Sequence, residues 1–282
     1  MQTIKKKKLN KFIKRSKNNN EYINQTEKYL KLFNNFPEIK FLLNQILEAD
    51  RLLKQNLLPQ SLPKMILPDN IQDIIYRKIS EKYPLGNSEG DKLWDQLTSQ
   101  LPKLDKHLRN FRDYLENNYG MWAYISAPFG KQLSNYLQNK NVLEIMAGNG
   151  YVSKALRQYN PSNKNYATDS KTWNKINATG NHPVTKIEKL SAIDAIDKYK
   201  NDIDCVIMSW APDKEIDDYQ VLEKIRNINA QQHKLNLIII GEYKGATNST
   251  KFWNNAILEN IETLSNKISH FDLINDKVYL VN

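Results

Sequence analysis

Cysteine is almost absent from this sequence, since Cys205 is the single example among 282 residues. One cysteine excludes an internal disulfide framework and a cysteine-based zinc cluster. The four histidines show no metal-ligand spacing, so no metal site is expected. No apolar run approaches the roughly 20 residues that span a membrane, and the N-terminus lacks the apolar stretch of a secretory signal. We therefore expect a cytoplasmic protein without a membrane span.

Glycine is also scarce, and it is unevenly placed. Residues 1–85 contain none, whereas seven of the nine glycines lie from Gly120 onward. Glycine is needed where the backbone turns sharply or approaches a ligand closely. The second half of the chain is therefore the half in which a binding site is expected.

The net charge of +10 is concentrated at the N-terminus. Residues 1–17 carry eight basic residues and no acidic one, whereas residues 18–115 and 116–282 each have a net charge of +1. A basic tail of this kind can hold nucleic acid or an anionic surface, and a solvated, flexible tail without a partner is the equal alternative. Any nucleic-acid partner is therefore expected to contact residues 1–17.

Residues 18–115 have the apolar spacing of helices. Apolar side chains recur every three or four residues over 22–33, 39–53, 71–79 and 104–115. We predict a helical N-terminal region that precedes the glycine-containing half.

Short apolar strands alternate with helical patterns in residues 116–282. The terminal residues are predicted to form two short strands around a turn at Asn275–Asp276. Alternation of strand and helix implies a mostly parallel sheet covered on both faces, and the terminal hairpin adds an antiparallel edge. The predicted fold class is α/β, a Rossmann-like sheet preceded by the helical region. The expected strands are 141–146, 166–168, 184–187, 204–209 and 235–241, and the expected helices include 151–159, 219–228 and 252–268.

The strongest motif is the stretch VLEIMAGNGY over residues 142–151. It places Glu144 in a strand, Gly148 and Gly150 in the turn that follows, and then a helix whose first N–H groups can face a ligand. Asp169 follows Gly150 by 19 residues, at the end of the next strand. An acid that binds ribose hydroxyls is expected at that position.

Two cofactor classes use this layout. A nicotinamide site prefers G-x-G-x-x-G, and Ser153 stands at the third glycine position, which leaves a nicotinamide-dependent oxidoreductase as an alternative. Glu144 favours the other class, because a carboxylate suits the cationic methionine end of S-adenosylmethionine (SAM). The stretch resembles the first motif of class I SAM-dependent methyltransferases, E/D-x-G-x-G-x-G, with Met146 in place of the first glycine. The resemblance covers about residues 119–282.

The resemblance implies cofactor-binding residues at several strand ends. The glycine turn would line the methionine part of SAM, and Asp169 would hold the ribose. The residues after the third strand, Ser191 and Ala192 or alternatively Asp194, would contact adenine. An aromatic stretch over 119–126 would fold over the cofactor. The implied set is Tyr119, Trp122, Glu144, Ala147, Gly148, Gly150, Asp169, Ser191, Ala192 and Ser209.

Four segments further resemble a poorly characterised subgroup of bacterial and fungal methyltransferase-like proteins. Its W-A-I-P-like, E-x-G-A-G-x-G-Y-W, W-P-P-Y and G-E segments have counterparts at 122–125, 144–151, 210–213 and 241–242. No firmly assigned substrate is known for that subgroup, so the resemblance concerns the fold more than the acceptor.

Candidate catalytic residues follow the fourth and fifth strands. Ser209, Trp210 and Asp213 stand where amino-group methyltransferases carry the N/D/S-P-P-Y/F/W turn that holds the acceptor nitrogen. Glu242 ends the fifth strand and is a candidate general base. The resemblance implies a SAM-dependent methyltransferase with an unidentified acceptor, an amino nitrogen or RNA being two options. The incomplete turn and Met146 leave a catalytically degenerate SAM-binding or partner-binding module as the alternative.

Overall fold

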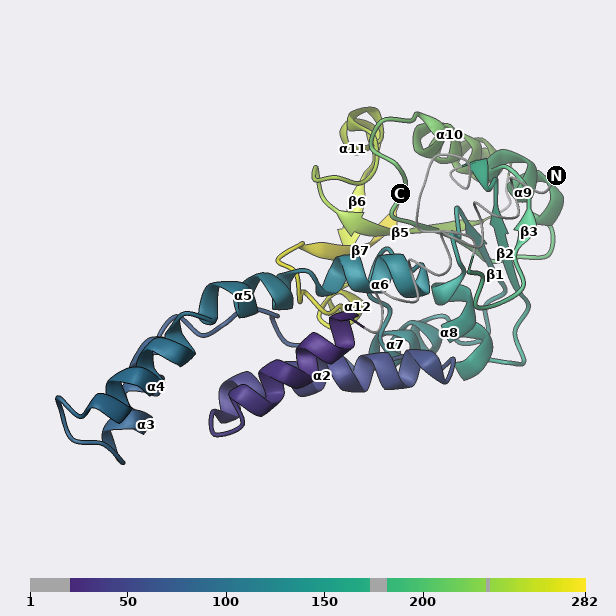
Figure 1. The fold of residues 1–282 in the computed structure, drawn as a ribbon. Coiled ribbons are helices and arrows are strands. Elements are labelled where there is room, and N and C mark those ends of the chain that lie inside the picture. The colour runs from purple at the N-terminus through teal and green to yellow at the C-terminus, as the bar shows by residue number, and fades with distance from the viewer. Residues whose placement is uncertain (1–20, 173–181, 232–233) are drawn as a thin grey trace, which may run out of the picture.

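The N-terminal part of the chain is helical, as predicted. The computed structural model describes residues 21–172, 182–231 and 234–282, so the basic segment 1–17 lies outside the described residues. These helices are amphipathic, and their apolar stripes are buried against one another. They occupy residues 21–32, α2 (Pro37–Lys54), α3 (Ile71–Ser80), α4 (Ser88–Thr98), α5 (Leu101–Arg109) and α6 (Phe111–Tyr119) (Figure 1).

The remaining elements build a mixed α/β unit. The helices are α7 (Ala127–Tyr136), α8 (Tyr151–Tyr159), α9 (Ala192–Tyr199), α10 (Asp217–Ala230), α11 (Thr250–Asn255) and α12 (Glu262–Ser265). The strands are β1 (Val142–Ile145), β2 (Asn165–Asp169), β3 (Glu188–Lys189), β4 (Cys205–Ser209), β5 (Asn236–Glu242), β6 (Leu258–Asn260) and β7 (Asp276–Val281).

The seven described strands form one sheet in the order β3-β2-β1-β4-β5-β7-β6. Neighbours from β3 to β5 pair in parallel, and β7 runs antiparallel to both β5 and β6. From β1 the chain first adds β2 and β3 on one side of the sheet and then returns to add β4 and β5 on the other side. The direction in which strands are added therefore reverses at β1. Ligands of such sheets bind at this switch point, beyond the carboxyl ends of the strands. The predicted fold class and the antiparallel C-terminal edge are confirmed.

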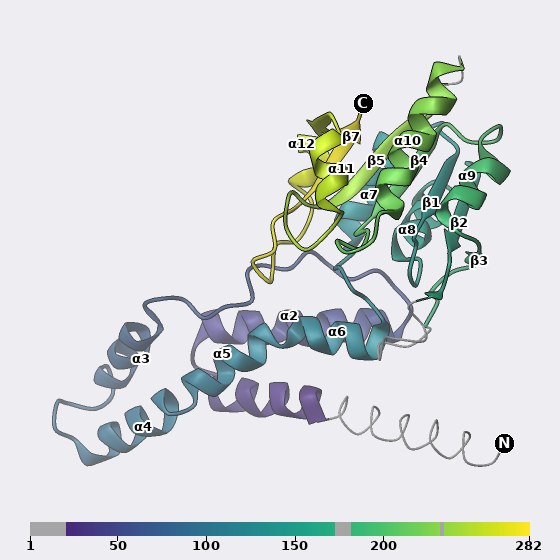
Figure 2. The same ribbon diagram turned by 90° about the horizontal axis from the view of Figure 1, so that it is seen from above.

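Two hydrophobic cores cover the two faces of the sheet. One core joins alternate strand residues to α7, α8, α12 and the N-terminal helices. The other joins the opposite strand residues to α9, α10 and α11. The N-terminal helices therefore lie on the α7–α8 side, and α3 and α4 extend away from the sheet as an arm (Figure 2).

The predicted third strand at 184–187 is wrong by its whole length, because pairing with β2 begins at Glu188. The backbone groups of the expected strand have other partners. Val184 donates its N–H to the Asn149 carbonyl at 2.9 Å, and the Arg157 guanidinium binds the Lys186 carbonyl at 2.8 Å. The segment is thus held against the start and the side of α8 instead of the sheet edge.

The C-terminal elements also differ from their prediction. The expected helix over 252–268 is interrupted, because Ala256 has extended backbone and β6 pairs with β7. The expected hairpin around Asn275–Asp276 is wrong, since no strand precedes Asp276 there. The antiparallel partners of β7 come from β5 and β6 instead, which are distant in the sequence.

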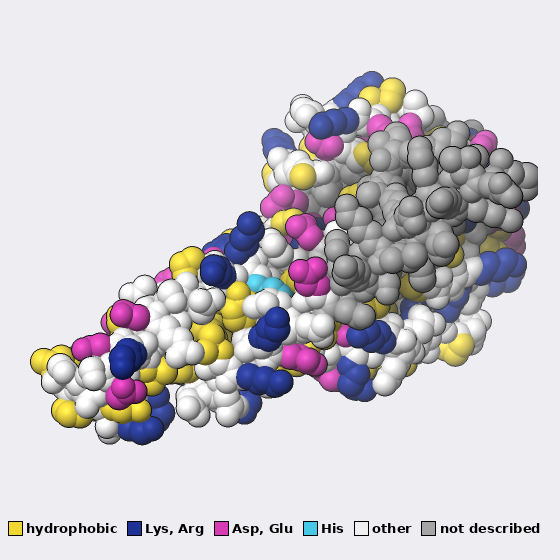
Figure 3. Space-filling view, viewed as in Figure 1, with side chains coloured by type: hydrophobic (Ala, Val, Ile, Leu, Met, Phe, Trp, Pro, Cys, Tyr) yellow, Lys and Arg dark blue, Asp and Glu magenta, His cyan; other side chains and the backbone are white. Residues whose placement is uncertain are grey.

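The surface of the helical part carries charges of both signs. Lys and Arg side chains are interspersed with Asp and Glu side chains along the arm (Figure 3). This mixture agrees with the near-neutral charge of residues 18–115. Among the described residues, no helix has the length and apolar character that crossing a membrane requires.

Candidate functional site

The turn between β1 and α8 lies at the switch point of the sheet and contains three left-handed residues. Met146, Gly148 and Gly150 have φ values of +53°, +55° and +83°. Met146 therefore adopts a conformation that glycine takes without strain and that costs energy for a residue with a side chain. Gly150 has a second constraint, because a Cβ there would lie 2.8 Å from the Thr185 side chain. The motif thus builds a tight turn, and of its two glycines only Gly148 is a position where an added Cβ would meet no other atom of the described residues within 4 Å.

Asp169 connects the end of β2 to this turn. Its Oδ2 accepts a hydrogen bond from the Gly148 N–H at 2.8 Å, and its Oδ1 accepts one from the Lys171 N–H at 2.6 Å. The residue is only 4% exposed. The structure therefore brings together two of the predicted cofactor-binding residues, one from each strand end.

Glu144 lies beneath the turn and is 2% exposed. Its Oε2 accepts hydrogen bonds from the N–H and the hydroxyl of Ser153, in the first turn of α8; the N–H bond is 2.8 Å long. Burial raises the pKa of Glu144 to about 7, and the bonds from Ser153 oppose this rise. Ser153, which stands at the third glycine position of a dinucleotide motif, thus donates two hydrogen bonds to the Glu144 carboxylate. The predicted contact of Glu144 with SAM stays a prediction.

Asn149 fastens the turn to the segment after α6, and the motif analysis did not single it out. Its side-chain amide donates to the Gly120 carbonyl at 2.9 Å, and its Oδ1 accepts the His182 N–H at 3.0 Å. Next to it, the Tyr151 hydroxyl donates to the Tyr119 carbonyl at 2.8 Å. The sequence signal for this role was the position of Asn149 between Gly148 and Gly150. A polar side chain in such a turn either faces solvent or forms hydrogen bonds that fix the turn.

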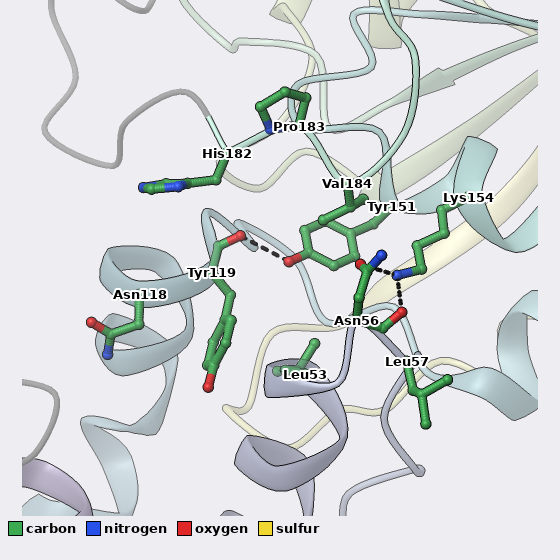
Figure 4. A pocket seen from close by; sticks show the side chains of 10 residues that line it. All are labelled: Leu53, Asn56, Leu57, Asn118, Tyr119, Tyr151, Lys154, His182, Pro183 and Val184. Atoms are coloured by element: carbon green, nitrogen blue, oxygen red, sulfur yellow. Dashed lines mark hydrogen bonds between the residues drawn. The ribbon is translucent and has the colours of Figure 1, made fainter. Parts of the chain in front are cut away.

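A cavity of about 340 Å³ adjoins this contact (Figure 4). It lies between the end of α2, the end of α6 and the start of α8, so both halves of the chain form its walls. The Lys154 ammonium donates to the backbone and side-chain oxygens of Asn56 across one wall. Tyr119 is the one predicted site residue among its lining residues, which are Leu53, Asn56, Leu57, Asn118, Tyr119, Tyr151, Lys154, His182, Pro183 and Val184.

The ends of β4, β5 and β7 form a second group of predicted residues. Because Ile145 pairs with Met208, Ser209 leaves the sheet beside the glycine turn. Ser209 is 6% exposed, and its hydroxyl has no hydrogen-bond partner among the residues that the structure describes. The turn continues with Trp210, whose φ is +48° and whose N–H binds the Ile240 carbonyl at 2.8 Å.

Asp276, which sequence reasoning missed, belongs to this second group. It pairs with Glu242 across β5 and β7 and is 7% exposed. Burial raises the pKa of Asp276, and the nearby Trp210 indole and Arg112 oppose the rise. The Trp210 indole N–H lies close enough to Asp276 to lower its pKa, and among the described residues neither the indole N–H nor the Asp276 Oδ1 has another hydrogen-bond partner. Glu242 itself accepts the Asn275 N–H at 3.1 Å.

The remaining predicted residues lie apart from these two groups or have other partners. The Ser191 hydroxyl caps α9, which begins at Ala192, by accepting the Asp194 N–H at 3.2 Å. The Trp122 side chain is 43% exposed, and Asp213 is exposed beyond the end of β4. Within the described ranges, no group of three or more potential ligands could hold a metal ion.

No protein-family model matches the chain, and no curated protein matches it. Solved structures similar to it include a candidate O-methyltransferase from Nostoc punctiforme, at 15% identity and a TM-score of 0.35, covering 77% of this chain and 69% of that one. The plantazolicin methyltransferase with bound SAH, the demethylated product of SAM, is 8% identical with a TM-score of 0.36, covering 76% and 95%. Human N-acetylserotonin methyltransferase with SAM is 10% identical with a TM-score of 0.34, covering 75% and 65%.

Proposed function

We propose that this chain binds SAM across the ends of β1 and β2 and transfers its methyl group to an acceptor. The carrying observation is the hydrogen bond from the Gly148 N–H to Asp169. It places a left-handed glycine turn beside a buried carboxylate at the switch point of the sheet. A nucleoside with an attached charged group needs these two elements next to each other.

The residues at this site fit the chemical groups of SAM. Each oxygen of the Asp169 carboxylate can accept more than one hydrogen bond, so it can hold ribose hydroxyls while it binds the turn. The N–H of Ser153 is bound to Glu144, so the positive end of α8 favours the carboxylate of the methionine part through the N–H groups that precede Ser153. Bound SAM supplies an electrophilic methyl group, and its transfer leaves the thioether SAH. The contribution of the protein is then to orient the acceptor, which accounts for much of the acceleration in such reactions.

Ser209 supports an acceptor that donates a hydrogen bond, such as an amino group or a hydroxyl. Its buried, unpaired oxygen lies at the end of β4, beside the turn. An unpaired buried hydroxyl is costly unless a ligand group completes its hydrogen bonding. Asp276, buried beside the Trp210 indole, adds a second acceptor group at this end of the sheet. Asp213 is exposed, so Ser209 is the better candidate for the acceptor contact.

An RNA acceptor would depend on residues 1–17, which carry most of the excess charge. Deleting them should weaken RNA binding and flatten its salt dependence, because fewer counterions would be released.

Transfer is tested by incubating the protein with methyl-labelled SAM and, in separate reactions, a cell lysate depleted of nucleic acid or a total RNA pool. Mass spectrometry then locates the label. The account predicts labelled product with the wild-type protein and none with Asp169→Ala. The variant Asp73→Ala is the matched control, since it removes an exposed carboxylate on α3, outside the candidate site.

Two failures have different meanings. If SAM binds and no labelled product forms in either pool, the non-catalytic SAM-binding alternative replaces the enzyme proposal. If Asp169→Ala labels as well as the wild type, the assignment of the cofactor site is wrong.

A further inference from the structure

Asp50 is a buried carboxylate on α2, and no step of the proposed reaction uses it. It is 4% exposed and gathers three donors. Its Oδ1 accepts the hydroxyls of Tyr114 and Tyr119, each at 2.5 Å, and its Oδ2 pairs with the Lys54 ammonium at 2.7 Å. Burial and the bond to Asp50 raise the pKa of both phenols, so both remain protonated donors. Each carboxylate oxygen of Asp50 therefore has at least one donor. Because Tyr114 and Tyr119 lie on α6, their hydrogen bonds hold α6 against α2.

Of the two tyrosines, only Tyr119 continues toward the glycine turn. Tyr119 is the last residue of α6, and its own carbonyl accepts the hydroxyl of Tyr151, the first residue of α8. The next residue, Gly120, accepts the Asn149 amide from the centre of the turn. A short path of hydrogen bonds therefore leads from Asp50 to the residues on both sides of Gly150.

Gly120 makes this path stiff. Its φ is +61°, which ends α6 and points its carbonyl toward the turn. A Cβ at Gly120 would lie only 2.2 Å from the Asn149 side-chain nitrogen. The backbone of Tyr119–Gly120 and the turn are thus in direct contact, so a shift of the α6 end would move Asn149.

We propose that Asp50 is a positioning residue for the cofactor turn, acting through Tyr119, Gly120 and Asn149. The N-terminal helices are then part of the cofactor site, although Asp50 does not touch the cofactor. The inference rests on the proposed function, because it assigns the turn to SAM. Its physical basis is pre-organisation: a turn that is held in its binding conformation in only part of the molecules binds with proportionally lower affinity.

Tyr114 provides a matched control for this proposal. Its hydroxyl binds the same oxygen of Asp50 as the Tyr119 hydroxyl does; Tyr114 is buried and Tyr119 is half-buried. Tyr114 also packs edge-on against the Tyr119 ring, with centroids 6.1 Å apart, but among the described residues no hydrogen bond joins Tyr114 to the turn itself. Tyr114→Phe should therefore lower the stability much as Tyr119→Phe does, and only Tyr119→Phe should disturb the cofactor turn.

The experiment titrates SAH into the full-length wild type, Tyr119→Phe, Tyr114→Phe and Asp50→Asn by calorimetry, at a temperature where all are folded. Tyr119→Phe and Asp50→Asn should each weaken SAH binding about tenfold, which corresponds to one hydrogen bond to a charged group. Tyr114→Phe should change it less than twofold. The double variant Asp50→Asn/Tyr119→Phe should bind no more weakly than the weaker single variant, because both break one path.

Hydrogen exchange of the amides at 147–152 gives a readout that does not depend on SAH. Exchange should be faster in Tyr119→Phe than in Tyr114→Phe. Equal SAH affinities of these two variants, or equal exchange rates at the turn, would overturn the proposal. If the wild type itself fails to bind SAH, the proposed function is wrong, and the exchange result alone then decides whether Asp50 positions the turn.

Discussion

Replacing Glu144 by Gln should make the stability of this protein less sensitive to pH. The carboxylate is fully buried, and its pKa is raised from 4.5 to about 7. Gln has the same shape, and its carbonyl can still accept the bonds from the Ser153 N–H and hydroxyl. It cannot ionise, so the variant removes the titration and keeps most of the packing.

The sign and size of the effect follow from linkage. A carboxyl group whose pKa is higher in the folded state binds its proton more tightly there, so the fold loses stability as the pH rises from 4.5 through 7. A rise of this size corresponds to about 3 kcal/mol of unfolding free energy above pH 7. Relative to the wild type, Glu144→Gln should therefore gain about 3 kcal/mol between pH 4.5 and pH 8, with most of the gain between pH 5 and 7.

Urea denaturation of both proteins over this pH range measures the difference directly. Other titrating groups contribute to both curves and cancel in the difference. A difference in unfolding free energy that stays constant from pH 4.5 to 8 would refute the reasoning, because it would show that Glu144 does not titrate between these values.

Three further predictions concern the cofactor site, its supporting glycine and the basic tail. Asp169→Ala should weaken SAM binding by at least about tenfold through the loss of charge-assisted hydrogen bonds, measured by calorimetry, and Asp73→Ala should leave the affinity unchanged. Gly120→Ala should lower the unfolding free energy, measured by urea denaturation, by about 2–3 kcal/mol. The alanine would be strained in the left-handed conformation, and its Cβ would also displace the Asn149 side chain and break its hydrogen bond. The control Gly86→Ala, also left-handed but in open space, should cost only about 1 kcal/mol. Deleting residues 1–17 should reduce both the affinity for a single-stranded RNA oligonucleotide and the slope of log K against log salt, and unchanged values would remove the charge argument for an RNA acceptor.

The parallel part of the sheet could be predicted because its strands are short apolar runs with glycine or polar residues after them. The stretch 142–145 and its following turn carry both signals. The strand β6 could not be predicted, because Leu258–Asn260 has no strand pattern of its own and is extended through pairing with β7. The segment 184–187 has the apolar pattern of a strand but is not one. Its backbone groups bind Asn149 and Arg157 and therefore do not pair with β2.

The candidate site shows the same division between local and distant signals. Gly148, Gly150 and Asp169 were predicted from spacing, and the structure places Gly148 in direct contact with Asp169. Asp50 and Asp276 were missed, because each gains its neighbours from elements far away in the sequence. A carboxylate in a helix or at the start of a strand is normally a solvated charge, and only the packing shows that these two are buried.

The central claim is that the turn after β1 and Asp169 together bind SAM, and calorimetric titration of the wild-type protein with SAM and with SAH tests it most directly. The account predicts saturable binding of both ligands at one site per chain. Absence of binding by either ligand at millimolar concentration would contradict it.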